Sequence, residues 1–292
     1  MSELLEKFSL VHGILLQNRS AIVSMVDPNL VDSKIDHCFF RTLTLGSSAP
    51  VDRYAAWSCV SATAHAGDDA VFLGEGGQIA HVRGGSLNQG SVSGPDVMPR
   101  QRGPLRALRR IGEHLFVAGM NRQVYRGTLG GGWGNMSCPA PDGVSGFEAI
   151  DGFGEDEIYC VGWDGAICWR EQGVWHEVDS PTNVVLTSLC CADDGVVYAG
   201  ARNGLILAGR RDDWRVLEQD PVFGDVWSIA QGPDAIYFAS TRVVFRFDGS
   251  DFEPALIPAT TFFQLHAEPG ALLSIGAKDA AVFDGTTWQK LL

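Results

Sequence analysis

The chain has little positive charge. Its 22 lysines and arginines stand against 35 aspartates and glutamates, which leaves a formal net charge of −13 at pH 7. Nucleic-acid phosphates and anionic membrane surfaces are bound mainly through basic side chains, so this balance argues against both as partners. An acidic chain instead suits a basic protein partner, because its electric field attracts one.

Long apolar runs are also missing. Apolar runs such as residues 13–16 and 21–23 fall far short of the ~20 residues that span a membrane. The first residues carry acid where a secretory signal peptide needs basic residues, and no suitable apolar stretch follows. The seven cysteines are odd in number and scattered, which favours buried thiols in a reducing compartment over a disulfide framework. We therefore expect a cytoplasmic protein.

The motifs of common catalytic and metal sites are lacking as well. The sequence has no Gly-x-Ser-x-Gly nucleophile turn, no P-loop and no dinucleotide-binding fingerprint. Its seven histidines show no His-x-x-x-His spacing, and it has no Cys-x-x-Cys pair. The sequence thus predicts no catalytic residue, no bound cofactor and no metal ligand.

Glycine, in contrast, is abundant. The 35 glycines are about 12% of the chain, against about 7% in average proteins, which indicates many tight turns and many short strands. Six short runs of β-branched or aromatic residues end in glycine or serine, at positions 74, 119, 162, 200, 240 and 276. These runs recur with a period near 40 residues, which is typical of repeat proteins.

Each run belongs to a larger unit. A turn such as Asp164-Gly165 or Asn203-Gly204 leads from it into a second apolar run, which is a strong hairpin signal. A further strand precedes each run. An outer strand follows about ten residues later and carries an aromatic side chain: Trp133, Trp175, Trp214, Phe252 or Trp288. We expect the four tryptophans to pack one blade against the next. Four strands in about 40 residues, repeated, predict the blade of a β-propeller.

The number of blades follows from the length. Residues 53–292 hold six such units, and residues 1–52 are long enough for one more. Within them, residues 13–17 and 21–26 flank a turn as a degenerate hairpin, with residues 38–43 as its outer strand. We predict an all-β single domain over residues 1–292, a propeller of four-stranded antiparallel blades with seven blades favoured. Six blades with an N-terminal extension are the alternative.

The units around Gly200 and Trp288 resemble the degenerate repeats of bacterial propellers, which pair a glycine-containing turn with a tryptophan on the outer strand. Over roughly residues 53–292 the chain is similar to the photosystem-assembly and sialidase-like propellers. No unit supplies the sialidase motif Ser-x-Asp-x-Gly-x-x-Trp or the Trp-Asp and Gly-His signatures of eukaryotic repeat propellers. The resemblance therefore implies the architecture and no particular activity.

The loops divide by charge. In the expected strand order, the turns between the first and second strands of each unit share one rim and carry Asp68, Asp69, Glu155, Asp156, Glu157, Asp193 and Asp194. The hairpin tips on the opposite rim carry Met120, Trp163 and Arg202. Exposed acids steer a basic partner and an aromatic at a turn tip can anchor it, so we expect partner binding at these residues. The plainer interpretation is that the acids favour turns and solubility and that the Trp163 ring lies flat on its own blade.

A rigid scaffold with variable loops and no chemical motif favours a binding function. We therefore predict a non-catalytic, protein-binding propeller, either an inhibitor or immunity protein that neutralises a basic toxin, or an assembly scaffold. The alternative is a propeller enzyme, a hydrolase or lyase, whose site is built from loops at the central channel.

Overall fold

The computed structural model describes residues 3–45, 47–48, 53–140, 146–218 and 224–292. The chain forms two compact units. Unit 1 comprises Met1–Gly74, Ala80–Gln89 and Ala230–Leu292, and unit 2 comprises Glu75–Ile79 and Gly90–Ile229.

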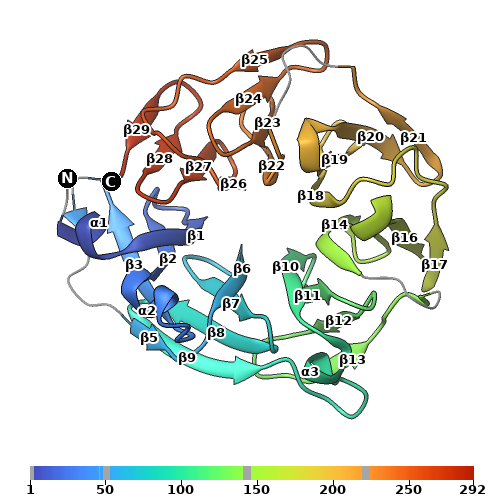
Figure 1. Ribbon diagram of the computed structural model, residues 1–292, viewed down its shortest axis with the longest axis horizontal. Coiled ribbons are helices and arrows are strands. Elements are labelled where there is room, and N and C mark those ends of the chain that lie inside the picture. The colour runs from blue at the N-terminus through green and yellow to red at the C-terminus, as the bar shows by residue number, and fades with distance from the viewer. Residues whose placement is uncertain (1–2, 46, 49–52, 141–145, 219–223) are drawn as a thin grey trace. The chain divides into compact units, whose positions relative to one another are not determined.

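Seven antiparallel sheets follow one another along the described chain, and we number them as blades 1 to 7 (Figure 1). Blade 1 comprises β1 (Ser9–Leu15), β2 (Ala21–Val26), β3 (Cys38–Thr44), β4 (Ser47–Ser48) and β5 (Arg53–Ala55). Blade 2 comprises β6 (Cys59–Ala64), β7 (Ala70–Gly74), β8 (Gln78–Arg83) and β9 (Ser86–Ser91). Blade 3 comprises β10 (Leu105–Ile111), β11 (His114–Gly119), β12 (Val124–Gly127) and β13 (Trp133–Asn135).

The other four blades have the same form. Blade 4 comprises β14 (Phe147–Gly154), β15 (Glu157–Gly162), β16 (Ile167–Glu171) and β17 (Val174–Glu177). Blade 5 comprises β18 (Leu186–Cys191), β19 (Val197–Ala201), β20 (Ile206–Arg210) and β21 (Asp213–Val216). Blade 6 comprises β22 (Ser228–Gln231), β23 (Ile236–Ala239), β24 (Val244–Phe247) and β25 (Phe252–Pro254). Blade 7 comprises β26 (Gln264–Glu268), β27 (Ala271–Ile275), β28 (Ala280–Phe283) and β29 (Trp288–Lys290).

Helices are short and few in the described residues: α1 (Glu3–Lys7), α2 (Pro28–Asp32), α3 (Pro99–Arg102) and two 3₁₀ turns, Trp163–Gly165 and Arg202–Gly204. None of them is long and apolar enough to cross a membrane. All seven cysteines carry free thiols, and six of them are buried.

The prediction of seven antiparallel blades is confirmed, including the degenerate N-terminal one, in which two short strands, β4 and β5, share the fourth position. One detail was wrong. Residues 38–43 were expected to form the outer strand of blade 1, whereas both β4 and β5 pair with the far side of β3. The second strand of the blades is buried on both faces, as in β7 and β27, which explains why the repeat shows continuous apolar runs there rather than alternation.

The outer-strand tryptophans reach the preceding blade, as predicted. The Trp214 ring meets Tyr159 of blade 4 edge-on at 6.3 Å between ring centres. Trp288 meets Tyr237 of blade 6 in the same way, also at 6.3 Å. The indole Nε1 of Trp175 donates a hydrogen bond of 2.8 Å to the carbonyl of Met136, which follows blade 3. The repeat position therefore joins one blade to the next.

Within unit 1, the first and last blades of the chain are in direct contact, and Figure 1 shows β1 beside β26 and β27. The amide of Leu10 donates to the carbonyl of Ala277 at 2.9 Å. The amide of Gly13 donates to Gln264 Oε1 at 2.6 Å. Apolar side chains of both blades share one buried cluster. Blade 7 supplies all four of its own strands, so the chain ends do not exchange a strand.

Candidate functional site

Successive turns of an antiparallel blade lie at alternate ends of its strands. We call the turns between first and second strands the AB turns, and those between second and third strands the BC turns. The predicted acids lie in or directly beside the AB turns of blades 2, 4 and 5: Asp68, Asp69, Glu155, Asp156, Glu157, Asp193 and Asp194. Met120, Trp163 and Arg202 lie in the BC turns of blades 3, 4 and 5. Within these blades, the predicted acids therefore lie at one end of the strands, and Met120, Trp163 and Arg202 lie at the other end, as predicted.

The acids of the AB turns differ in exposure. Asp68, Asp156, Asp193 and Asp194 are exposed, as loop acids were expected to be. Asp69 is not, since only 8% of the residue is accessible. Its carboxylate lies 3.0 Å from His81 Nε2 and 3.6 Å from Arg83 Nε, both on β8 of the same blade. A partner has little access to this group.

Glu157 joins two blades. Its carboxylate forms a bidentate ion pair with Arg210 of blade 5, with both oxygen–nitrogen distances at 2.8 Å. The hydroxyl of Tyr159 donates to the same carboxylate at 2.7 Å. The hydrogen bond from Arg210 outweighs the effect of burial and lowers the pKa of Glu157 below its ordinary value. This acid holds neighbouring blades together, and its charge is largely compensated.

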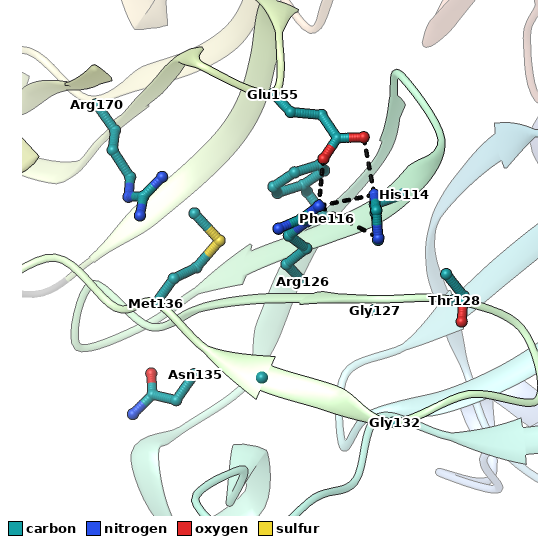
Figure 2. A pocket seen from close by; sticks show the side chains of 11 residues that line it. His114, Phe116, Arg126, Gly127, Thr128, Gly132, Asn135, Met136, Glu155 and Arg170 are labelled. Atoms are coloured by element: carbon teal, nitrogen blue, oxygen red, sulfur yellow. Dashed lines mark hydrogen bonds and ion pairs between the residues drawn. The ribbon is translucent and has the colours of Figure 1, made fainter. Parts of the chain in front are cut away.

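Glu155 lies in a polar pocket of about 350 Å³ between blades 3 and 4 of unit 2 (Figure 2). Its carboxylate contacts His114 Nδ1 at 2.8 Å, accepts the amide of Glu113 at 3.0 Å and pairs with Arg126. Burial alone would raise the pKa of Glu155, but the bonds from His114 and Glu113 and the charge of Arg126 lower it. Glu155 therefore stays ionised, which suits ion pairing and not general-acid chemistry.

The same pocket contains a second guanidinium. Arg170 of β16 lines the pocket together with Arg126, and Figure 2 shows it apart from the cluster around Glu155. Burial and the like charge of Arg126 lower the pKa of Arg170. Two guanidinium groups in one polar pocket can hold a small anionic group. This pocket could not be predicted from the sequence, because Arg126 and Arg170 are 44 positions apart and no motif links them.

Two of the three predicted residues in the BC turns are less exposed than the sequence suggested. Trp163 is half-buried, and its indole Nε1 donates a 2.6 Å hydrogen bond to Glu148 of the same blade. The guanidinium of Arg202, from blade 5, lies 5.8 Å from the centre of the Trp163 ring. Met120 is half-buried and its amide donates to the carbonyl of Pro104 at 3.0 Å. Of the three residues, only Arg202 is exposed.

Sequence reasoning also missed a buried cation in unit 2. The side chain of Arg122 is only 3% exposed and forms a bidentate pair with Glu177, with Nη1 to Oε2 at 3.0 Å. Its guanidinium carbon lies 5.9 Å from the centre of the Phe147 ring. The hydrogen bond from Arg122 lowers the pKa of Glu177. Among the described residues, no three His, Cys, Asp or Glu side chains gather in a way that could hold a metal ion.

The Arg122–Glu177 pair predicts a pH-dependent contribution to stability. The pKa of Glu177 is lower in the folded state, so the pair stabilises above the unfolded pKa of about 4.3 and is lost as pH falls through the folded pKa. We expect Glu177→Gln to lower the free energy of unfolding at pH 7 by about 1–2 kcal/mol, between the values for exposed and buried pairs. The difference from the parent should shrink towards pH 3.

Denaturant unfolding across pH 3–7 measures this effect. Glu253→Gln, at an exposed position on β25, is the matched control and should follow the parent at every pH. A Glu177→Gln variant whose deficit stays constant from pH 7 to pH 3 would show that the ionised pair is not its cause.

The seven antiparallel blades define the class of the protein: it is a β-propeller. Its structure is similar to the WD40 β-propeller domain of Doa1, with a TM-score of 0.67, 13% identity, and coverage of 94% of this chain and 92% of that one. It is also similar to YCF48 bound to the D1 peptide, with a TM-score of 0.65, 13% identity, and coverage of 93% and 90%. At such identities the likeness shows the fold alone. No protein-family model matches the chain.

The sequence identifies the family. The chain is 35% identical to the immune protein Tsi7 of Pseudomonas aeruginosa strain PAO1, and the alignment covers 97% of each chain. The chain therefore belongs to the family of the immune protein Tsi7. This relationship bears out the predicted immunity protein among the two binding roles, and its partner is accordingly a protein.

Proposed function

We propose that the chain protects a bacterial cell by binding a basic protein toxin in the cytoplasm, without catalysis of its own. The observation that carries the proposal is the 35% identity to an immune protein along 97% of both chains. The net charge of −13 supports a basic partner, because opposite charges speed encounter. The free thiols support a reducing compartment.

The test uses a basic protein toxin from the source genome. That toxin is produced from an inducible promoter in a bacterial host that lacks both genes, with or without the chain. We expect growth to be restored when the chain is present, and purified chain to form a stable complex with a catalytically inactive toxin. Continued growth arrest, with the chain folded and in excess, would contradict the proposal.

We further propose that the exposed acids of the AB turns contribute to the encounter with the toxin. Reversal of Asp193 and Asp194 of blade 5 to lysine should slow association about tenfold at low salt, and the effect should shrink as salt screens the charges. Both residues are exposed, so the effect on melting should be small and limited to the loss of the hydrogen bonds that Asp194 accepts from the Tyr198 hydroxyl and the Val196 amide. Glu155 and Glu157 are left intact, since their ion pairs join blades.

The matched control reverses the same number of charges elsewhere. Asp251 and Glu253 are exposed acids at the outer strand of blade 6, and their replacement by lysine changes the net charge equally. Association rates are measured by surface plasmon resonance at 20 and 300 mM salt. Equal slowing in the two variants would show that only total charge matters and that the AB turns have no special role.

A further inference from the structure

One BC turn differs from the others in length. The second and third strands of blades 2 to 7 are joined by three or four residues, whereas in blade 1 residues 27–37 separate β2 from β3. We call residues 27–37 the blade 1 insertion. It contains α2, and it lies wholly within unit 1.

The blade 1 insertion is held in one conformation by its own hydrogen bonds. The carboxylate of Asp27 caps α2 by accepting the amide of Asn29 at 2.9 Å. The buried His37 ties the two ends together: its Nε2 accepts the amide of Asp27 at 2.8 Å, and its Nδ1 contacts the carbonyl of Ile35 at 2.7 Å. The amide of Ile35 in turn donates to Leu30 at 2.9 Å. Binding through such a preformed element costs little conformational entropy.

Folding does not explain the apolar side chains of the insertion. No residue of α2 is buried. Val31 is 50% exposed and Ile35 is 49% exposed, and neither lies in the two buried clusters that blade 1 forms with blades 7 and 2. Residues 31–36 are all exposed. Two exposed aliphatic side chains on a hydrogen-bonded insertion, outside both of these clusters, are the pattern of an interaction surface.

The charges around these side chains indicate what covers them. Asp27, Asp32 and Asp36 accompany a single Lys34, so the insertion is acidic like the whole chain. A second copy would bring one acidic insertion to a surface of net charge −13, and an anionic membrane would repel it in the same way. A basic protein surface with an apolar depression matches both the charge and the aliphatic tip.

We propose that the blade 1 insertion docks the toxin, with Val31 and Ile35 entering an apolar depression on a basic surface and the surrounding aspartates steering it there. The inference rests on the proposed function, since it takes the partner to be a basic toxin. The inference names the segment of the chain that contacts the toxin, which the proposed function leaves open. Apolar anchors that are desolvated after encounter act mainly on the rate of dissociation.

The test compares two double variants of the full chain. Val31→Ser with Ile35→Ser should raise the Kd for the same toxin at least tenfold, chiefly through faster dissociation that salt hardly alters. Val174→Ser with Val216→Ser is the matched control, because these residues of β17 and β21 are 58% and 41% exposed aliphatics on outer strands. The control should bind like the parent. Both variants should melt within a few degrees of the parent, because the four side chains are exposed.

The outcomes separate the two proposals. Toxin binding by the parent together with unchanged binding by the Val31/Ile35 variant would overturn the docking role and leave the immunity function intact. A parent chain that does not bind the toxin would overturn both. Sedimentation equilibrium adds a third arm: a parent that forms dimers, with dimerisation lost in the Val31/Ile35 variant, would assign the insertion to a second copy and also overturn the inference.

Discussion

Deletion of residues 1–45 is expected to abolish cooperative folding and to make the remaining chain aggregate. The deletion removes β1, β2 and β3, and β1 packs against β6 of blade 2 and against β26 and β27 of blade 7. Two buried clusters of unit 1 draw side chains from both sides of these contacts. Their loss exposes a large apolar surface on each neighbouring blade, and such surfaces associate.

The backbone contributes to the same loss. The amides of Leu10, Gly13 and Leu15 donate to acceptors of blade 7, which are Ala277, Gln264 and His266. In the shortened chain the buried His266 and the half-buried Gln264 and Ala277 lose these donors.

Size-exclusion chromatography with light scattering and denaturant unfolding measure the result, with the full chain as the reference. We predict that residues 1–292 act as one domain. A shortened chain that stays monomeric and unfolds in one cooperative transition would show that blade 1 is dispensable and that this prediction is wrong.

The architecture could be predicted because it depends on features that every blade repeats. The runs ending at Gly119, Gly162 and Gly276 mark the second strand, and the tryptophans mark the fourth. Both kinds of residue serve contacts within a blade or to the next one, so the same signal recurs about every 40 residues. Blade 1 lacks most of these marks, and its prediction relied on length and a weak hairpin pattern.

The state of the acidic residues could not be predicted from the sequence. Glu157 and Arg210 are 53 positions apart, and nothing in either segment indicates that the side chains meet. Asp69 was predicted to be an exposed turn residue, but its carboxylate contacts His81 and Arg83 of β8 and is buried. The blade 1 insertion escaped notice for another reason. It lies in the one unit that does not align with the repeat, so its extra length did not stand out.

The glycines that end the second strands provide the last prediction. Gly162 and Gly276 each lie directly beside the backbone segment that leads into the first strand of the same blade. A Cβ on Gly162 would overlap the carbonyl oxygen of Gly146 and come within 2.7 Å of the Cα of Phe147. A Cβ on Gly276 would overlap the carbonyl oxygen of Thr261. These are backbone atoms, so no side-chain rotation can relieve the overlap.

We expect Gly162→Ala and Gly276→Ala each to lower the free energy of unfolding by about 3 kcal/mol, the upper part of the range for overpacked sites. Gly90→Ala is the matched control, since a Cβ there meets no atom within 4 Å, and it should stay within about 0.5 kcal/mol of the parent. Denaturant unfolding gives all three values. Blade 6 carries the buried Ser240 at this repeat position, so its connection accommodates a Cβ. If Gly162→Ala lowered the free energy of unfolding as little as the control does, blade 4 would also accommodate a Cβ at this position. The close approach of two backbone segments would then not explain the repeated glycine.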